Sequence, residues 1–405
     1  MLKSKLDHIL HCHPIIRTDI IKGKNTDLYS KSGKKIIDFE AGIWCTALGH
    51  SNQRIKTVII EQLDKIIHLH YRLTSDISEV LALNLLEQVH FKDGKAVFLS
   101  SGSEAVELGI TISKLISKGN KILTFSHSYL SAYSNTAIPR ARDLWIELDF
   151  LRCNNCPNEE CTSKCSVLEN LVFSEISTFI LEPGSSSGRV LFPPYKLVNF
   201  LAKTIKTHGG SIVVDEVTTG LGRTGKWFGY NHYDLKPDII ALGKSLGNGY
   251  PISAVVMSKE IANEIELKNF HYAQSHQNDP LGCVIANEVI NIIRENDMIR
   301  HSEEIGEFFI SQLRYIQNSN SIIKEVRGRG LMLAMELNIK NITEIVCEEM
   351  LERGYFIGTT AACNVLRFYP ALTISKKDIL SMCEALKEIL LQIESDQHFY
   401  TNRGI

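Results

Sequence analysis

Short, largely apolar runs alternate with helical stretches between residues 95 and 258, and this alternation restricts the fold more than any other feature of the sequence. The runs cover residues 95–100, 121–125, 178–183, 211–217, 238–244 and 253–258. A strand that is apolar on both faces is stable in a sheet that helices cover on both sides. The order of strands and helices therefore predicts an α/β fold with a mostly parallel central sheet and right-handed crossovers.

The rest of the chain predicts a smaller α+β unit. Helical periodicity predicts helices over residues 281–295, 303–317 and 376–394, and residues 324–337 predict a pair of strands around glycine. A KSGKK segment at 31–35 predicts a small hairpin. We expect three parts, which are an N-terminal segment (1–50) that joins the small domain, a large domain (51–285) with a cysteine-rich insertion (151–166), and a small C-terminal domain (286–405).

Charge and composition limit the classes of partner. The chain has 44 Lys and Arg against 46 Asp and Glu, a formal net charge of −2, which excludes a broad cationic field for nucleic acid or anionic lipid. No apolar run approaches the ~20 residues that span a bilayer, and the first residues lack the apolar core of a signal peptide. We therefore expect a cytoplasmic protein with no nucleic-acid or membrane partner.

A turn of small residues follows the run that ends at residue 100. Ser101, Gly102 and Ser103 open a helix there, and free backbone N–H groups, hydroxyls and the helix dipole suit an anion such as phosphate. The spacing of Ser101 and Glu104 equally fits a capping box, which needs no ligand. The segment alone does not separate these two interpretations.

An acid and a lysine end two other runs of the predicted sheet. Asp215 needs a cationic partner if it is buried, either a protonated pyridine nitrogen or an arginine such as Arg223. Lys244 follows the next run, and a lysine desolvated among small residues can form a Schiff base. A phosphate cradle, a strand-end acid and a strand-end lysine at one sheet edge are what pyridoxal 5'-phosphate requires.

A series of motifs covers most of the chain, from about residue 38 to residue 373. They are DFEAGIWCTALGH (38–50), SSGSEAVE (100–107), ILEP (180–183), DEVTTGLGRTGKWF (215–228), GKSLGNGYP (243–251), RGRGLM (327–332) and LRFYPALTI (366–374). With these motifs the sequence resembles the class III (ω-type) family of pyridoxal-phosphate-dependent aminotransferases, which have fold type I. The resemblance implies a homodimer with shared active sites, an internal aldimine at Lys244 and pairing of Asp215 with the pyridinium nitrogen.

The resemblance also assigns the remaining cofactor contacts. They are Ser101, Gly102 and Ser103 at the phosphate, Glu182 in ILEP, Tyr129 on one ring face and Val217 on the other, Thr218 near the phenolic oxygen, and Ser275 reaching the phosphate across the dimer interface. Several positions depart from the family pattern. Leu130 and Ser131 replace the usual His and Gly after Tyr129, and Thr218 replaces the usual Gln.

Two positions concern the substrate. Arg367 stands where the family places the arginine that binds the substrate carboxylate, and a guanidinium fork suits that group. The alternative for Arg367 is an ion pair inside the small domain. Ser187 replaces the gating glutamate of ornithine-type enzymes, which argues against close similarity to them.

Four cysteines, Cys153, Cys156, Cys161 and Cys165, lie within 13 residues. This spacing suits a structural Zn²⁺ or an iron–sulfur cluster, although it is not that of a standard zinc finger. Free or disulfide-linked thiols and simple packing of the loop are the alternatives.

The sequence thus predicts an aminotransferase that moves an amino group from an amine or amino acid donor to a keto acid by ping-pong half-reactions. An epimerase, aminomutase or decarboxylase on the same fold is the alternative, because such relatives share every cofactor anchor. A binding protein without turnover is a third possibility, which the intact Lys244 and Asp215 argue against.

Overall fold

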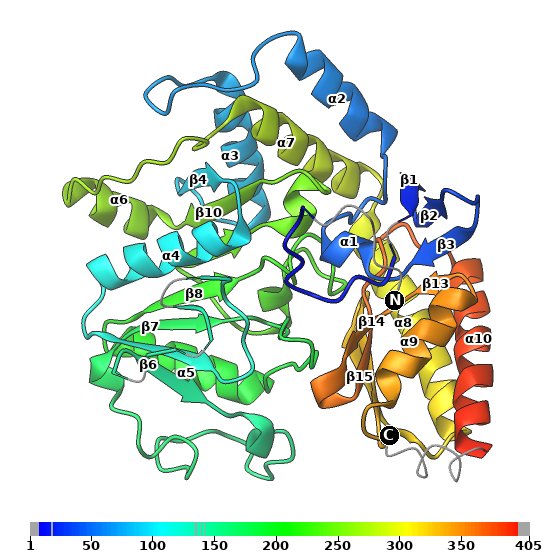
Figure 1. The fold of residues 1–405 in the computed structure, drawn as a ribbon. Coiled ribbons are helices and arrows are strands. Elements are labelled where there is room, and N and C mark those ends of the chain that lie inside the picture. Colours follow the sequence, from blue (N-terminus) through cyan, green and yellow to red (C-terminus); the bar gives the residue numbers. More distant parts are fainter. Residues whose placement is uncertain (1–7, 18, 134–135, 139, 142, 396–405) are drawn as a thin grey trace.

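A seven-stranded sheet forms the centre of the larger of two lobes (Figure 1). The structure is a computed structural model, and it describes residues 8–17, 19–133, 136–138, 140–141 and 143–395. The strands of this sheet, in spatial order, are β4 (Lys95–Leu99), β10 (Ser253–Met257), β9 (Ile239–Leu242), β8 (Ser211–Asp215), β7 (Ile176–Leu181), β5 (Lys121–Phe125) and β6 (Trp145–Leu148). Only β10 runs antiparallel to its neighbours, β4 and β9. The predicted α/β fold with a mostly parallel sheet is confirmed, and β6 is the strand that the sequence analysis missed.

Helices cover both faces of this sheet, which explains why its strands are apolar throughout. Val213 and Ile239 pack with α4 (Gly102–Ile116) on one face, while their neighbours Ile212 and Ile240 belong to the core on the other face, where α5 (Tyr195–Thr207) lies. The other helices of this lobe are α2 (Gln53–Leu63), α3 (Asp76–Gln88), α6 (Lys259–Leu267) and α7 (Pro280–Glu295).

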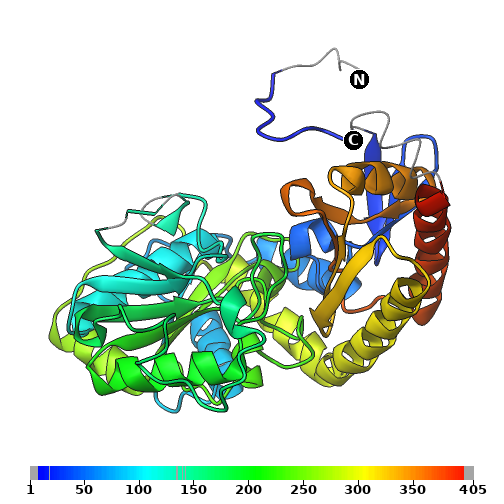
Figure 2. The same cartoon turned by 90° about the horizontal axis from the view of Figure 1, so that it is seen from below.

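The smaller lobe holds two four-stranded sheets and lies beside the larger one (Figure 2). One sheet has the order β1 (Ile20–Lys24), β2 (Asp27–Ser30), β3 (Lys35–Asp38), β13 (Tyr355–Phe356), and the other β11 (Ile323–Arg329), β12 (Met332–Leu337), β15 (Val365–Phe368), β14 (Gly358–Thr360). Its helices are α8 (Met298–Asn318), α9 (Ile342–Glu352) and α10 (Lys376–Ser395). The predicted hairpin at 31–35 and strand pair at 324–337 are confirmed.

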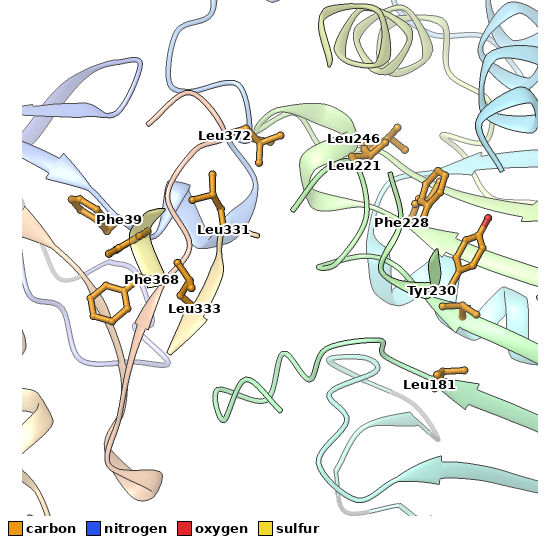
Figure 3. Close-up of a cluster of buried hydrophobic side chains, with 14 of the residues drawn as sticks. Phe39, Leu181, Leu221, Phe228, Tyr230, Leu246, Leu331, Leu333, Phe368 and Leu372 are labelled. Atoms are coloured by element: carbon orange, nitrogen blue, oxygen red, sulfur yellow. The ribbon is translucent and has the colours of Figure 1, made fainter. Parts of the chain in front are cut away.

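Pairing of β3 with β13 joins the N-terminal segment to the C-terminal part of the chain. The largest buried apolar cluster extends through both lobes, from Phe39 and Phe368 on one side to Leu246 and Phe228 on the other (Figure 3). The short α1 (Ala41–Trp44) lies where the lobes meet (Figure 1). The predicted domain limits stay a prediction, and the limit after residue 285 falls inside α7.

Within the described ranges, no helix is both long enough and apolar enough to cross a membrane. A cytoplasmic location stays a prediction.

Candidate active site

The ends of three strands meet at one edge of the central sheet. Strands β4 and β9 both run antiparallel to β10, so they end at the same edge, and β8 lies parallel to β9. The loops that follow them approach closely: a Cβ on Gly102 would lie 2.6 Å from Val217 Cγ1, and one on Gly243 would lie 3.3 Å from the Cα of Gly102. Only glycine fits this approach at Gly102, and the geometry brings the predicted phosphate turn, Asp215 and Lys244 to one edge.

The turn after β4 is a capping box that leaves donors free. Ser101 Oγ accepts from the Glu104 N–H at 3.3 Å, and Glu104 Oε2 accepts from the Ser101 N–H at 2.7 Å. Gly102 and Ser103 begin α4, so their N–H groups have no acceptor within the helix. The capping box is therefore confirmed, and the phosphate site stays a prediction, with which the two N–H groups at the positive end of the helix are compatible.

Asp215 is a buried acid with little local compensation. It is 3% exposed, and its Oδ1 accepts from the Val217 N–H at 3.0 Å. Burial raises the pKa of Asp215, and the nearby Lys244 amine acts against that rise. Arg223 is not its partner, because one guanidinium nitrogen of Arg223 donates to the carbonyls of Leu331 and Pro370 and the other two nitrogens have no partner in the described part of the chain. The suggestion of an Asp215–Arg223 salt bridge is therefore wrong.

Lys244 lies directly after β9 with an unusual backbone. Its φ is +43°, in the left-handed region, and such strain is found where surrounding structure holds a functional residue. Its Nζ donates to Thr218 Oγ1 at 2.6 Å and lies 4.7 Å from the centre of the Trp44 ring. Burial lowers the pKa of Lys244, with the Asp215 charge opposing this, so the amine is more readily neutral and nucleophilic than a surface lysine.

Glu182 connects the ILEP segment to Tyr129. Its Oε2 accepts from the Tyr129 N–H at 2.8 Å, and its Oε1 accepts from both the N–H and the hydroxyl of Ser186. Burial, and then the charge of Asp215, raise the pKa of Glu182. Glu182 thus fixes the backbone of Tyr129. Tyr129 itself is 45% exposed.

The segment after Tyr129 is fixed by α4. Ser103 Oγ accepts from the Ala132 N–H at 3.1 Å, and Leu130, which stands where relatives have His, is 3% exposed. The helix that would bind phosphate therefore also positions the loop of the proposed ring-stacking tyrosine.

Arg367 forms an ion pair within the smaller lobe, which is the alternative that the sequence left open for it. Its Nη2 lies 3.2 Å from Glu40 Oε2, and its guanidinium lies 5.3 Å from the centre of the Trp44 ring. Burial raises the pKa of Glu40 to about 7. Trp44 also stacks on Tyr369, with ring centres 4.6 Å apart. Trp44 therefore joins Lys244 to Arg367 across the junction of the lobes.

Ser275 lies outside this cluster. It is exposed and shares a surface cavity with residues from the loop between α2 and α3, which are His68, His70 and Tyr71. The role of Ser275 at the phosphate of a partner chain stays a prediction.

The four thiols of the cysteine-rich insertion lie near one another, but not close enough together to form a metal site as they stand. Burial, and then the neighbouring thiols of Cys165, Cys161 and Cys156, raise the pKa of Cys153. Across the part of the chain that the structure describes, the one group of three or more His, Cys, Asp or Glu residues whose ligand atoms lie within 4.8 Å of one another is elsewhere, at His68, His276 and Asp279. Both histidines there bond to Asp279 through Nδ1.

The residues at the sheet edge fit pyridoxal phosphate. The buried carboxylate of Asp215, which is only partly paired, suits the protonated ring nitrogen of the cofactor. The desolvated amine of Lys244 suits its aldehyde carbon, and the N–H groups in the first turn of α4 suit its phosphate. Glu40, Trp44, Arg223 and Tyr369 were not assigned to the site from the sequence. The signal available was that all four lie in motifs on which the resemblance rests, at residues 38–50, 215–228 and 366–374.

We predict that the cofactor-free protein loses stability as pH rises from 6 to 7.5. Burial raises the pKa of four acids, which are Glu40, Glu182, Asp215 and Glu216. The folded protein keeps protons that the unfolded chain has lost above pH ~4, so stability falls as pH rises toward the folded pKa values. Burial lowers the pKa values of His232 and Lys244, which has the opposite effect on stability. These two groups are outnumbered by the four acids.

Thermal unfolding of the apo-protein at the two pH values measures this effect. We expect Tm to be lower at pH 7.5 by at least about 3 °C, and by less in the cofactor-bound protein. An equal or higher Tm of the apo-protein at pH 7.5 would contradict the burial of these four acids.

Known proteins are similar to this chain in both sequence and fold. The profile of the family described as aminotransferase class-III matches residues 11–390. The acetylornithine aminotransferase of Aquifex aeolicus is 29% identical over 399 residues, which cover 95% of this chain and 100% of that protein. The leucine/methionine racemase of Thermococcus litoralis is 28% identical over 403 residues, covering 92% of this chain and 90% of that protein.

Among solved structures, the S-selective transaminase from an Arthrobacter species superposes with a TM-score of 0.84 at 25% identity. The superposition covers 94% of each chain. The similarity in sequence and the similarity in fold therefore both extend over nearly the whole length of this chain.

Proposed function

The chain belongs to the class III aminotransferases and is a pyridoxal-phosphate-dependent aminotransferase of fold type I, and from this premise we propose how its own residues carry out amino transfer. The observation that carries the proposal is the position of the Lys244 amine, 2.6 Å from Thr218 Oγ1 and at the sheet edge where Asp215 ends β8. The same edge holds the free N–H groups that begin α4.

Bound pyridoxal phosphate would supply a conjugated, positively charged ring that accepts electrons from the substrate carbon. The N–H groups of Gly102 and Ser103 would hold its phosphate, Asp215 would pair with its ring nitrogen, and Val217 and Tyr129 would flank the ring. Lys244 would form its covalent attachment and, once free, act as the base at the substrate carbon. Thr218 holds the Lys244 amine in position through the hydrogen bond described above.

The substrates of the proposal are an amine or amino acid donor and a keto acid acceptor, both of which need an anchor away from the amine. Arg367 would bind a substrate carboxylate, since its guanidinium lies against Trp44 on the same ring that Lys244 contacts. This arrangement sets the carboxylate apart from the reacting amine, at the junction of the two lobes.

A second candidate function is racemisation or epimerisation of an amino acid. It is favoured by the similarity to the leucine/methionine racemase, which covers 92% of this chain. Racemisation needs the same base and the same ring, but the proton returns to the opposite face of the carbon from which it was removed, and the amino group stays on that carbon.

Nitrogen transfer distinguishes the two functions. The cofactor-bound protein is incubated with a panel of amines and amino acids, each with and without 2-oxoglutarate or pyruvate, and products are separated on a chiral column. We expect a new amino acid to form only when a keto acid is present. Inversion of the donor without a keto acid, and without nitrogen transfer, would overturn the proposal in favour of the racemase.

We also propose a homodimer that completes each site with Ser275 of the partner. Exposed apolar side chains on α2, α3 and the loop between them support this, namely Ile60, Leu63, Ile67, Tyr71, Leu73, Val80 and Leu83. Tyr71 lies at the cavity that Ser275 lines. A patch of this kind on a soluble protein is typical of an interface, and the mass in solution tests the proposal.

A structural Zn²⁺ or iron–sulfur cluster at Cys153, Cys156, Cys161 and Cys165 is a separate proposal. The thiols surround Cys153 in a segment that has turns in place of long helices or strands, where a metal would act as a staple. We predict about one equivalent of zinc, or two to four of iron, per chain by elemental analysis. Replacement of Cys156 and Cys161 by serine removes that metal, whereas Cys383→Ser retains it; metal-free wild-type protein would contradict the proposal.

A further inference from the structure

Buried polar atoms without partners gather on the small-lobe side of Lys244. In the described part of the chain, the atoms that lack a hydrogen-bond partner include Glu40 Oε1, Trp44 Nε1, Arg223 Nε and Nη2, Arg367 Nε and Tyr369 Oη. Unsatisfied buried polar groups are rare, and their concentration in one place points to a ligand. Most of these atoms are donors and two of the residues are guanidinium groups, so the ligand that suits them is an anion.

Contacts between these residues place the cluster beside the reacting amine. The Trp44 ring lies 4.7 Å from Lys244 Nζ, 5.3 Å from the Arg367 guanidinium carbon and 4.6 Å from the Tyr369 ring. Trp44 itself has a positive φ of 66°, as does the preceding Ile43 at 58°. A left-handed backbone conformation at a β-branched residue such as Ile43 costs free energy. The packing that directs the Trp44 side chain into the cluster compensates for this cost.

Glu40 already occupies part of this anion site. It is 4% exposed, and its Oε2 lies 3.2 Å from Arg367 Nη2. Gly358 of β14 supports it from behind, since a Cβ there would lie 2.2 Å from Glu40 Oε1. The fold therefore presses an internal carboxylate against the arginine that the proposed function assigns to the substrate carboxylate.

We propose that Glu40 is a specificity-determining residue, which pairs with Arg367 until a substrate carboxylate displaces it; this inference rests on the proposed role of Arg367. A substrate that is apolar at the end away from its amine leaves the ion pair of Glu40 and Arg367 intact. The Arg367 guanidinium then does not face the apolar group without a partner. A substrate with a carboxylate must compete with Glu40 for the guanidinium. Glu40 thereby weakens the binding of carboxylated substrates and admits amines that lack a carboxylate.

Displacement has a consequence for protons. Two carboxylates beside one guanidinium repel each other, and the buried one takes up a proton. Burial has already raised the pKa of Glu40 to about 7. The titratable or charged groups that face it are Arg367 on β15, Asp38 at the end of β3, Arg223 after β8, Cys347 on α9 and Tyr369 after β15.

The test is calorimetric titration of the cofactor-bound protein with glutarate, a dicarboxylate that has no amine to react. We expect Glu40→Gln to bind glutarate at least tenfold more tightly than wild type, because the amide carries no charge to compete for Arg367. Glu288→Gln makes the same chemical change in the ion pair with Arg54 on α2, and it should leave the affinity unchanged. Equal or weaker binding by folded Glu40→Gln protein would overturn the proposal.

Wild-type protein alone gives a second test that needs no variant to fold. Repeating the titration at pH 7.5 in two buffers of different ionisation enthalpy measures the protons taken up. We expect a net uptake on binding glutarate, and none would contradict the displacement of Glu40. Both readouts are independent of turnover, so a failure of amino transfer with a positive result here would count against the proposed function and not against the role of Glu40.

Discussion

Replacing Lys244 with alanine is expected to lower kcat by at least about 10³-fold for every donor, because one side chain serves as both covalent anchor and base. The Lys244 amine is the group that contacts both Thr218 and Trp44, and its lowered pKa makes it reactive. Alanine has no atom that could take over either role. Steady-state kinetics of the purified variant, with excess cofactor, measures the loss.

A matched control separates chemistry from folding. Lys259 is an exposed lysine whose ion pair with Asp93 lies on the surface, and Lys259→Ala should retain wild-type activity. The absorbance of the bound cofactor should change in Lys244→Ala and not in Lys259→Ala. Turnover of Lys244→Ala within tenfold of wild type would show that the reactive lysine is another one.

Asp215→Asn is expected to lower kcat/KM by about 10²-fold or more, because a neutral amide cannot stabilise a positive charge on the ring nitrogen. The carboxylate is 3% exposed and its pKa is raised by burial, so in the apo-protein its charge is only partly compensated. The cofactor-free variant should therefore be at least as stable as wild type, whereas cofactor binding should raise its Tm less. Kinetics and thermal unfolding with and without cofactor measure both effects.

The control for this variant is Asp93→Asn, which removes an exposed carboxylate of the surface pair with Lys259. It should change neither the kinetics nor the gain in Tm on cofactor binding. If Asp215→Asn binds cofactor and turns over like wild type, the assignment of Asp215 to the ring nitrogen is wrong.

The strands of the central sheet could be predicted because burial on both faces leaves an unambiguous apolar run. β6 was missed because its sequence, WIEL, contains an acid; Ile146 is half-buried and Glu147 is exposed, as is typical of an edge strand. Asp215 and Lys244 could be placed together because parallel strands end at the same edge. That inference needs only the order of the runs and no knowledge of side-chain contacts.

The substrate side of the site could not be predicted in the same way. Glu40 and Arg367 are 327 residues apart, and the pairing of β3 with β13 and the hydrogen bond from the Tyr369 N–H to the Phe39 carbonyl bring their segments together within the smaller lobe. Arg223 was considered as a partner of Asp215, yet it donates to carbonyls of the smaller lobe. Contacts between separate lobes leave no periodic trace in the sequence, and the contribution of a partner chain leaves even less.

The most direct test of the account is a single-turnover absorbance measurement on the cofactor-bound protein. Amines and amino acids are added one at a time while the yellow band of the bound cofactor is followed, and a keto acid is then added. We predict that at least one donor removes the band and that the keto acid restores it, with Lys244→Ala showing neither change. A band that no donor alters, or a donor that is inverted without any loss of the band, would contradict amino transfer at Lys244.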